Sequence, residues 1–216
     1  MRPPAEVIAL LREIGIIPVI RADSAATAVR VAETLAEAGI PIAEVTLTVP
    51  DAWDALRELA RRPGLLVGAG TVTESAQVPQ AIEAGAQFIV SPGFEAEVVR
   101  RAKGARVAVL AGALTPTEVL QASRSGADLV KIFPAQSVGG AAYIRALRGP
   151  FPAVLLVPTG GVSLETVGDF IRAGAAAVGV GGELVLREAL ARGDYAAIGS
   201  LAARFLQAVK VARACS

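Results

Sequence analysis

The sequence contains no histidine, no asparagine and a single cysteine, Cys215, among its 216 residues. Without histidine, Ser-His-Asp and Cys-His catalysis are excluded, and so are metal sites ligated by imidazole. One cysteine cannot form an intrachain disulfide. Any chemistry must therefore use lysine, glutamate, aspartate, arginine, tyrosine or backbone groups.

Strong net charge and long apolar runs are also lacking. The net charge is +1, the basic residues are dispersed, and no apolar stretch reaches the roughly 18 residues that span a bilayer. This composition argues against a nucleic-acid or membrane partner. The first 15 residues carry acidic side chains within a helix-like pattern, unlike a secretion signal, so we expect a cytoplasmic protein.

A unit of amphipathic helix, glycine and short apolar strand recurs along the chain. It is visible in LAEAGIPIAEV, AIEAGAQFIV, ASRSGADLV and FIRAGAAAVGV. The glycine stands where a helix C-cap needs a left-handed residue, and a continuous apolar strand is typical of a parallel sheet covered on both faces. The pattern predicts a repeated βα architecture.

Extending this pattern predicts eight strands that alternate with helices. The strands are expected at 16–21, 42–47, 65–70, 87–91, 107–111, 128–133, 154–158 and 176–180. The helices are expected at 3–14, 24–38, 51–61, 75–84, 95–103, 116–124, 140–147, 164–172 and 184–213, the last broken near Gly193. We predict an α/β fold, a single (β/α)8 TIM barrel with a short N-terminal helix, forming one domain over residues 1–216. A doubly wound open sheet would have fewer strands, and no GxGxxG motif follows the first strand.

One lysine lies within a strand that otherwise has the composition of a buried one. The cations are 18 arginines and three lysines, and Lys131 is surrounded by apolar residues in LVKIFPA. Burial disfavours the ammonium form, so some of Lys131 would be a neutral amine able to attack a carbonyl carbon. Arginine stays protonated and cannot do this. The alternative is a structural lysine that pairs with a carboxylate or extends to the barrel mouth.

A carboxylate, Glu44, stands inside the second strand, on the face shared by Ile42 and Thr46. A buried carboxylate is costly unless it is paired or takes part in chemistry. Beside an amine nucleophile it could act as general acid and base. A Glu44–Lys131 ion pair that only sets the barrel register would need the same geometry, so the sequence leaves both hypotheses open.

The ends of strands one, seven and eight carry residues suited to binding anions. Arg21 could hold a carboxylate in a bidentate manner, although a lone arginine is more often a surface charge. Glycine pairs stand in PTGGV, at Gly160 and Gly161, and in VGVGGEL, at Gly181 and Gly182. Loops at these places in barrels often bind phosphate through backbone N–H groups, and glycine permits close approach. The alternative is a pair of tight turns without a ligand.

Seven motifs, in this order, resemble the family of 2-keto-3-deoxy-6-phosphogluconate aldolases, which also includes 4-hydroxy-2-oxoglutarate aldolases. They are EVTLTVPDA, VGAGTVT, FIVSPG, TPTEV, VKIFPA, GPFPAVLLVPTGGV and AVGVGGEL, and the similarity runs from about residue 15 to residue 190. The resemblance implies a homotrimeric class I aldolase on a (β/α)8 barrel. It also implies a small 2-keto acid as substrate and no metal or other cofactor.

The resemblance further implies roles for individual residues. Lys131 would form a Schiff base, and Glu44 would be the acid and base. Residues that would surround the pyruvate part are Thr71, Pro92 and Phe133. Residues that would form the substrate and phosphate loop are Thr159, Gly160 and Gly161, beside the Gly181–Gly182 pair considered above.

Two positions depart from the family pattern. Thr48 stands where many members carry an arginine that binds the substrate carboxylate, and Arg21 would supply that charge instead. Gly182 stands where relatives usually have serine, so the phosphate loop lacks one hydroxyl. An unphosphorylated substrate such as 4-hydroxy-2-oxoglutarate therefore stays under consideration beside the phosphorylated one.

The expected reaction is cleavage of 2-keto-3-deoxy-6-phosphogluconate to pyruvate and glyceraldehyde 3-phosphate, with 4-hydroxy-2-oxoglutarate giving pyruvate and glyoxylate as a second reaction. The alternative is a phosphosugar isomerase or synthase on the same barrel, in which Lys131 binds phosphate without a covalent bond. A barrel that only binds a ligand is disfavoured, because burial of both Lys131 and Glu44 is hard to justify for binding alone.

Overall fold

The eight apolar segments form eight parallel strands in a computed structural model that describes residues 1–214. Every residue of these strands is buried, which explains why the sequence shows continuous apolar runs and no alternation. The strands are β1 (Ile16–Ile20), β2 (Ile42–Thr46), β3 (Leu66–Gly70), β4 (Phe88–Val90), β5 (Ala108–Ala113), β6 (Leu129–Ile132), β7 (Leu156–Pro158) and β8 (Val178–Val180).

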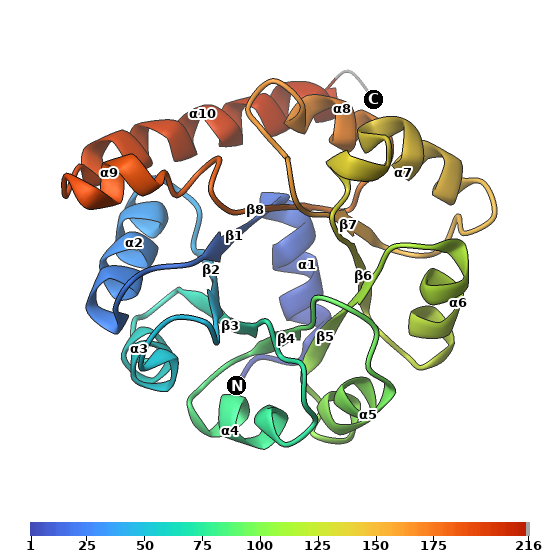
Figure 1. Cartoon of the computed structure of the whole chain (residues 1–216), viewed down its shortest axis with the longest axis horizontal. Helices are drawn as coiled ribbons and strands as arrows, with labels where there is room; N and C mark the ends of the chain where they lie inside the picture. The colour runs from blue at the N-terminus through green and yellow to red at the C-terminus, as the bar shows by residue number, and fades with distance from the viewer. Residues whose placement is uncertain (215–216) are drawn as a thin grey trace.

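The strands close into a ring. They pair in chain order from β1 to β7, and β8 pairs with β1. A bridge between Thr159 and Gly179 joins the β7 side to β8 and completes the barrel (Figure 1). Gly179 has no side chain at this closure, where a Cβ would lie 2.2 Å from Oγ1 of Thr159. The predicted TIM barrel is confirmed.

Helices surround the ring (Figure 1). They are α2 (Ala25–Glu37), α3 (Ala52–Leu59), α4 (Gln77–Glu83), α5 (Ala96–Gly104), α6 (Pro116–Arg124), α7 (Gly140–Arg148), α8 (Val167–Arg172), α9 (Arg187–Ala191) and α10 (Tyr195–Ala214). The glycines of the repeated unit have positive φ, as the C-cap interpretation requires; they are Gly39, Gly85, Gly126 and Gly174.

The first helix, α1 (Pro4–Ile14), covers the N-terminal end of the barrel. Its Val7 and Leu11 side chains are completely buried, and the helix contacts both β1 and β5, on opposite sides of the ring. Figure 1 shows α1 within the outline of the strands. The C-terminal ends of the strands are therefore the open end, where barrel enzymes place their active sites.

The predicted element boundaries agree with the structure to within a few residues. The last predicted helix is divided into α9 and α10 around Gly193, whose φ is 66°, as expected. A short 3-10 helix, η1 (Gln136–Val138), was not predicted. No helix within residues 1–214 combines the length and hydrophobicity needed to cross a bilayer, and Cys215 lies outside the described residues.

Candidate active site

Strand register places Lys131 and Glu44 on the inner face of the barrel. Glu44 is opposite Val19 of β1 and Gly68 of β3. Lys131 is opposite Gly112 of β5 and Val157 of β7. Because side chains alternate along a strand, the residues two positions later point to the same face, nearer the open end. These residues are Arg21, Thr46, Phe133 and Thr159.

The Nζ atom of Lys131 lies 3.4 Å from Oε1 of Glu44. The two side chains are only 5% and 2% exposed. Among residues 1–214, neither charged group has another hydrogen-bonding or ion-pair partner. The contact is longer than the usual 2.7–3.2 Å of an N–H···O hydrogen bond. The ring centroid of Phe133 lies 5.8 Å from the same Nζ atom and forms a wall beside it.

Gly70 makes room for the carboxylate of Glu44. It ends β3 opposite Thr46, and a Cβ built on it would lie 2.2 Å from Oε1 of Glu44. Any other residue would displace the group that contacts Lys131. Gly70 was not predicted as a site residue, although a glycine inside a strand signals a close approach of this kind.

The loops after β3 and β4 lie next to this pair along the sheet. Thr71 adopts φ of 58°, which is uncommon for a residue with a side chain, and is half-buried. Pro92 is also half-buried, and its carbonyl carbon would lie 2.3 Å from a Cβ on Gly112. Buried Ser91 accepts a hydrogen bond of 3.2 Å from the N–H of Gly112. Gly112 thus lets the Pro92 loop approach the strand neighbour of Lys131.

The loop after β7 is packed against the segment that follows Lys131. Gly160 and Gly161 have φ of 90° and 74°, and a Cβ on Gly160 would lie 3.1 Å from the Phe133 ring. The N–H of Gln136 donates to the carbonyl of Gly160 at 3.1 Å. The N–H groups of Gly161 and Val162 have no acceptor within the described part of the chain, so they are available to an anion.

The capping box of α6 fixes the loop after β5. The carboxylate of Glu118 accepts hydrogen bonds from the N–H of Thr115 at 2.7 Å and of Leu114 at 2.9 Å. These bonds, that from Thr115 first, hold the pKa of Glu118 below its ordinary value. The hydroxyl of Tyr143 on α7 donates to the carbonyl of Leu114. Burial, and then the charge of Glu118, raises the pKa of Tyr143.

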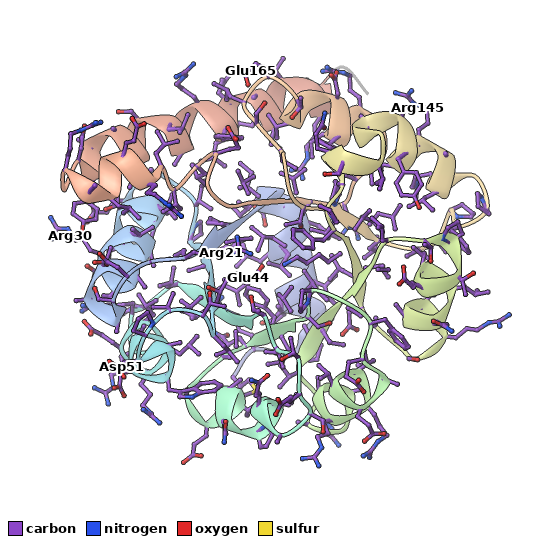
Figure 2. The ribbon with its side chains drawn as sticks, viewed as in Figure 1. Arg21, Arg30, Glu44, Asp51, Arg145 and Glu165 are labelled. Atoms are coloured by element: carbon purple, nitrogen blue, oxygen red, sulfur yellow. The ribbon has the colours of Figure 1, made fainter. Side chains whose placement is uncertain are left out.

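Arg21, Gly181 and Gly182 form a second group at the open end of the barrel. They line a cavity of about 650 Å³ at the ends of β1 and β8. No hydrogen bond or ion pair within residues 1–214 joins Arg21 to Glu44 or Lys131, and the arginine is exposed. Figure 2 shows Arg21 and Glu44 both within the ring of strands. Exposed Thr48 shares a hydrogen bond of 2.8 Å with Thr46.

A (β/α)8 barrel with a buried lysine and carboxylate in contact inside it has the architecture of the barrel enzymes. The profile of the KDPG and KHG aldolase family matches residues 7–201, and the chain belongs to this family of aldolases. It is 38% identical over 205 residues to a 2-dehydro-3-deoxy-phosphogluconate aldolase of Pseudomonas aeruginosa, covering 94% of this chain and 93% of the relative. It is 34% identical to the KHG/KDPG aldolase of Escherichia coli strain K12, covering 91% and 92%.

A solved structure of KDPG aldolase from Legionella pneumophila superimposes with a TM-score of 0.85 at 32% identity, covering 91% of this chain and 96% of that one. It was captured with pyruvate as a covalent carbinolamine intermediate at low pH.

Proposed function

We propose that this protein is a class I aldolase that cleaves 2-keto-3-deoxy-6-phosphogluconate to pyruvate and glyceraldehyde 3-phosphate through a Schiff base on Lys131. The observation that carries the proposal is the buried contact of 3.4 Å between Lys131 and Glu44. Membership of the aldolase family and the covalent pyruvate adduct of the Legionella relative support it.

The first half of the reaction needs a neutral amine and an acid. Moving one proton along the Lys131–Glu44 contact produces both at once, since the ion pair becomes an amine and a carboxylic acid. The amine attacks the C2 carbonyl carbon of the substrate and forms a carbinolamine. Glu44 then protonates the departing hydroxyl, and loss of water gives the iminium.

The second half uses the carboxylate that this step regenerates. Glu44 takes the proton of the C4 hydroxyl, directly or through a water molecule. The C3–C4 bond breaks, its electron pair moves into the iminium, and glyceraldehyde 3-phosphate leaves an enamine behind. Protonation of the enamine at C3 and hydrolysis by water release pyruvate and return the amine of Lys131.

The surrounding residues orient the substrate. Phe133, Thr71 and Pro92 enclose the three carbons that become pyruvate, and Arg21 holds the carboxylate in place of the family arginine missing at Thr48. The backbone around Thr159, and the glycine loops after β7 and β8, hold the phosphoryl end. Free N–H groups at Gly161 and Val162 support this assignment.

The decisive test is reduction with borohydride in the presence of pyruvate, followed by peptide mapping. The chain has three lysines, so the site of the adduct is unambiguous. We expect the adduct on Lys131 and none on Lys103 or Lys210. If the folded protein gives no adduct with excess pyruvate, the Schiff-base mechanism is wrong, and the isomerase or synthase alternative with Lys131 as a phosphate ligand gains support.

We also propose a second reaction, the cleavage of 4-hydroxy-2-oxoglutarate to pyruvate and glyoxylate. Two observations support it: the hydroxyl missing at Gly182, and the name of the Escherichia coli relative, KHG/KDPG aldolase. The ratio of kcat/KM for the two keto acids measures it directly. A phosphorylated substrate preferred by less than about tenfold, or about 1.4 kcal/mol, would support a dual activity.

We further propose that residues 1–216 act as one domain, assemble as a homotrimer and work in the cytoplasm. The family profile spans most of the chain, which supports a single functional unit. Sedimentation at several concentrations tests the trimer, and fractionation of cells tests the location.

A further inference from the structure

The cavity beside Arg21 extends beyond the residues that sequence reasoning identified. From the β1 side it is lined by Val19, Arg21 and Asp23. From the β8 side it is lined by Gly181 and Gly182, and then by residues of the following segment and α9, including Arg187. Its volume of about 650 Å³ is within the range of sites for small molecules.

The cavity is positively charged. The titratable side chains that line it are those of Arg21, Arg187 and Asp23. Neither guanidinium has a hydrogen-bond or ion-pair partner within residues 1–214, whereas Arg57, Arg100 and Arg172 on the helices each pair with a nearby carboxylate. Two unpartnered guanidiniums from different elements therefore line one space, and each can bind an anionic group.

The cavity lies beside the strand that neighbours Glu44. Val19 lines it and lies opposite Glu44 in the strand register. At its other side, Gly182 leaves space: nothing lies within 4 Å of where its Cβ would be, and its N–H has no acceptor in the described chain. A serine side chain at this position would have open space, and in this chain Gly182 and Arg187 both line the cavity.

We propose that Arg187 is a specificity-determining residue that binds the phosphoryl group of the substrate across this cavity, in place of the hydroxyl missing at Gly182; this inference rests on the proposed function. A sugar acid phosphate has two anionic ends. Arg21 is assigned to the carboxylate, and Arg187 supplies a planar, permanently charged donor for the other end. A hydrogen bond from the Arg187 guanidinium to a phosphoryl oxygen is stronger than one from the neutral hydroxyl that it replaces.

The test compares Arg187→Gln with the unmodified protein. For the phosphorylated keto acid we expect KM to rise about 10-fold to 100-fold, because one charged hydrogen bond is lost. We expect kcat to change by less than about 2-fold. Trapping of pyruvate on Lys131 should be unchanged, because pyruvate has no second anion. Arg192→Gln is the matched control, since Arg192 is exposed nearby and does not line the cavity.

A rescue separates a binding role from a structural one. Adding Gly182→Ser to Arg187→Gln should recover part of the lost affinity for the phosphorylated substrate, because the hydroxyl enters open space. An unchanged KM in Arg187→Gln overturns the proposal, and so does an equal loss of pyruvate trapping.

Inorganic phosphate tests the same residue independently of turnover. It should raise the Tm of the unmodified protein and of Arg192→Gln, and not that of Arg187→Gln. If the unmodified protein cleaves no phosphorylated keto acid but this pattern holds, the proposed function fails and the anion site stands. If phosphate stabilises all three proteins alike, the role of Arg187 is overturned.

Discussion

Lys131 and Glu44 are 87 positions apart in the chain, yet their side chains meet at 3.4 Å inside the barrel. Both are almost fully buried, so each charge depends on the other for compensation. A structural ion pair and a catalytic pair share this geometry. They differ in what happens to cleavage and to stability when one member is removed.

Lys131→Met should abolish both cleavage and borohydride trapping. It also leaves Glu44 buried without its partner, so we expect the free energy of unfolding to fall by about 3–5 kcal/mol. Denaturation in urea measures this loss. The double variant Lys131→Met/Glu44→Gln removes the stranded charge and should recover part of the stability while staying inactive. Trapping that survives in Lys131→Met would contradict the assignment of the nucleophile.

Glu44→Gln should keep the fold and the amine but lose the proton shuttle. We expect kcat to fall by about 10²–10⁴-fold, the usual contribution of a positioned acid–base group. Adduct formation with pyruvate should remain detectable at long incubation, which separates imine formation from cleavage. Full activity in this variant would reduce Glu44 to a structural partner of Lys131.

Gly70→Ala should disturb catalysis without touching a charged residue. The new Cβ would collide with Oε1 of Glu44, so the carboxylate must move away from Lys131 or the strands must shift. We expect a lower kcat and a stability loss of about 1–3 kcal/mol from overpacking. Gly104→Ala is the control, because nothing lies within 4 Å of its Cβ position at the end of α5. If both variants have similar kcat values, the close approach at Gly70 does not contribute to catalysis.

The capping box at Glu118 should make the stability of the protein depend on pH. The folded pKa of this carboxyl is lowered, chiefly by the N–H of Thr115, so its stabilising contribution is fully present above the unfolded pKa of about 4.3. It is lost as the pH falls through the folded pKa. Glu118→Ala should therefore cost about 1 kcal/mol at pH 7, with solvent screening keeping the value modest, and less in acid. A cost that is the same at pH 7 and at low pH would contradict this origin.

Much of the barrel could be predicted because its strands are buried on both faces and its helices end in glycines. The ends of each helix and strand can be read from a short stretch of sequence. Gly39, Gly85, Gly126 and Gly174 all adopt the positive φ that the pattern required. The 3-10 helix at Gln136–Val138 was missed, since three residues between a strand and a helix carry too little pattern to read.

For the site, sequence supplied the residue types and the strand ends, and the structure supplied the distances. The inner-face positions of Glu44 and Lys131 follow from alternation, so their meeting could be anticipated. The role of Gly70 depends on where the Glu44 side chain points across a neighbouring strand, which no single segment encodes. Arg187 was missed because it lies beyond the strand end, on α9, and it faces the Arg21 cavity only once β8 closes against β1.

Helix α1 closes the N-terminal end of the barrel. With Val7 and Leu11 filling the N-terminal end, everything that reaches Lys131 must pass the loops at the other end, and everything released must return the same way. Under the proposed reaction the three-carbon fragment stays bound to Lys131 inside the barrel, while the aldehyde lies nearer the open end. Both products therefore leave past the same loops, the aldehyde first and the pyruvate after its bond to Lys131 is hydrolysed.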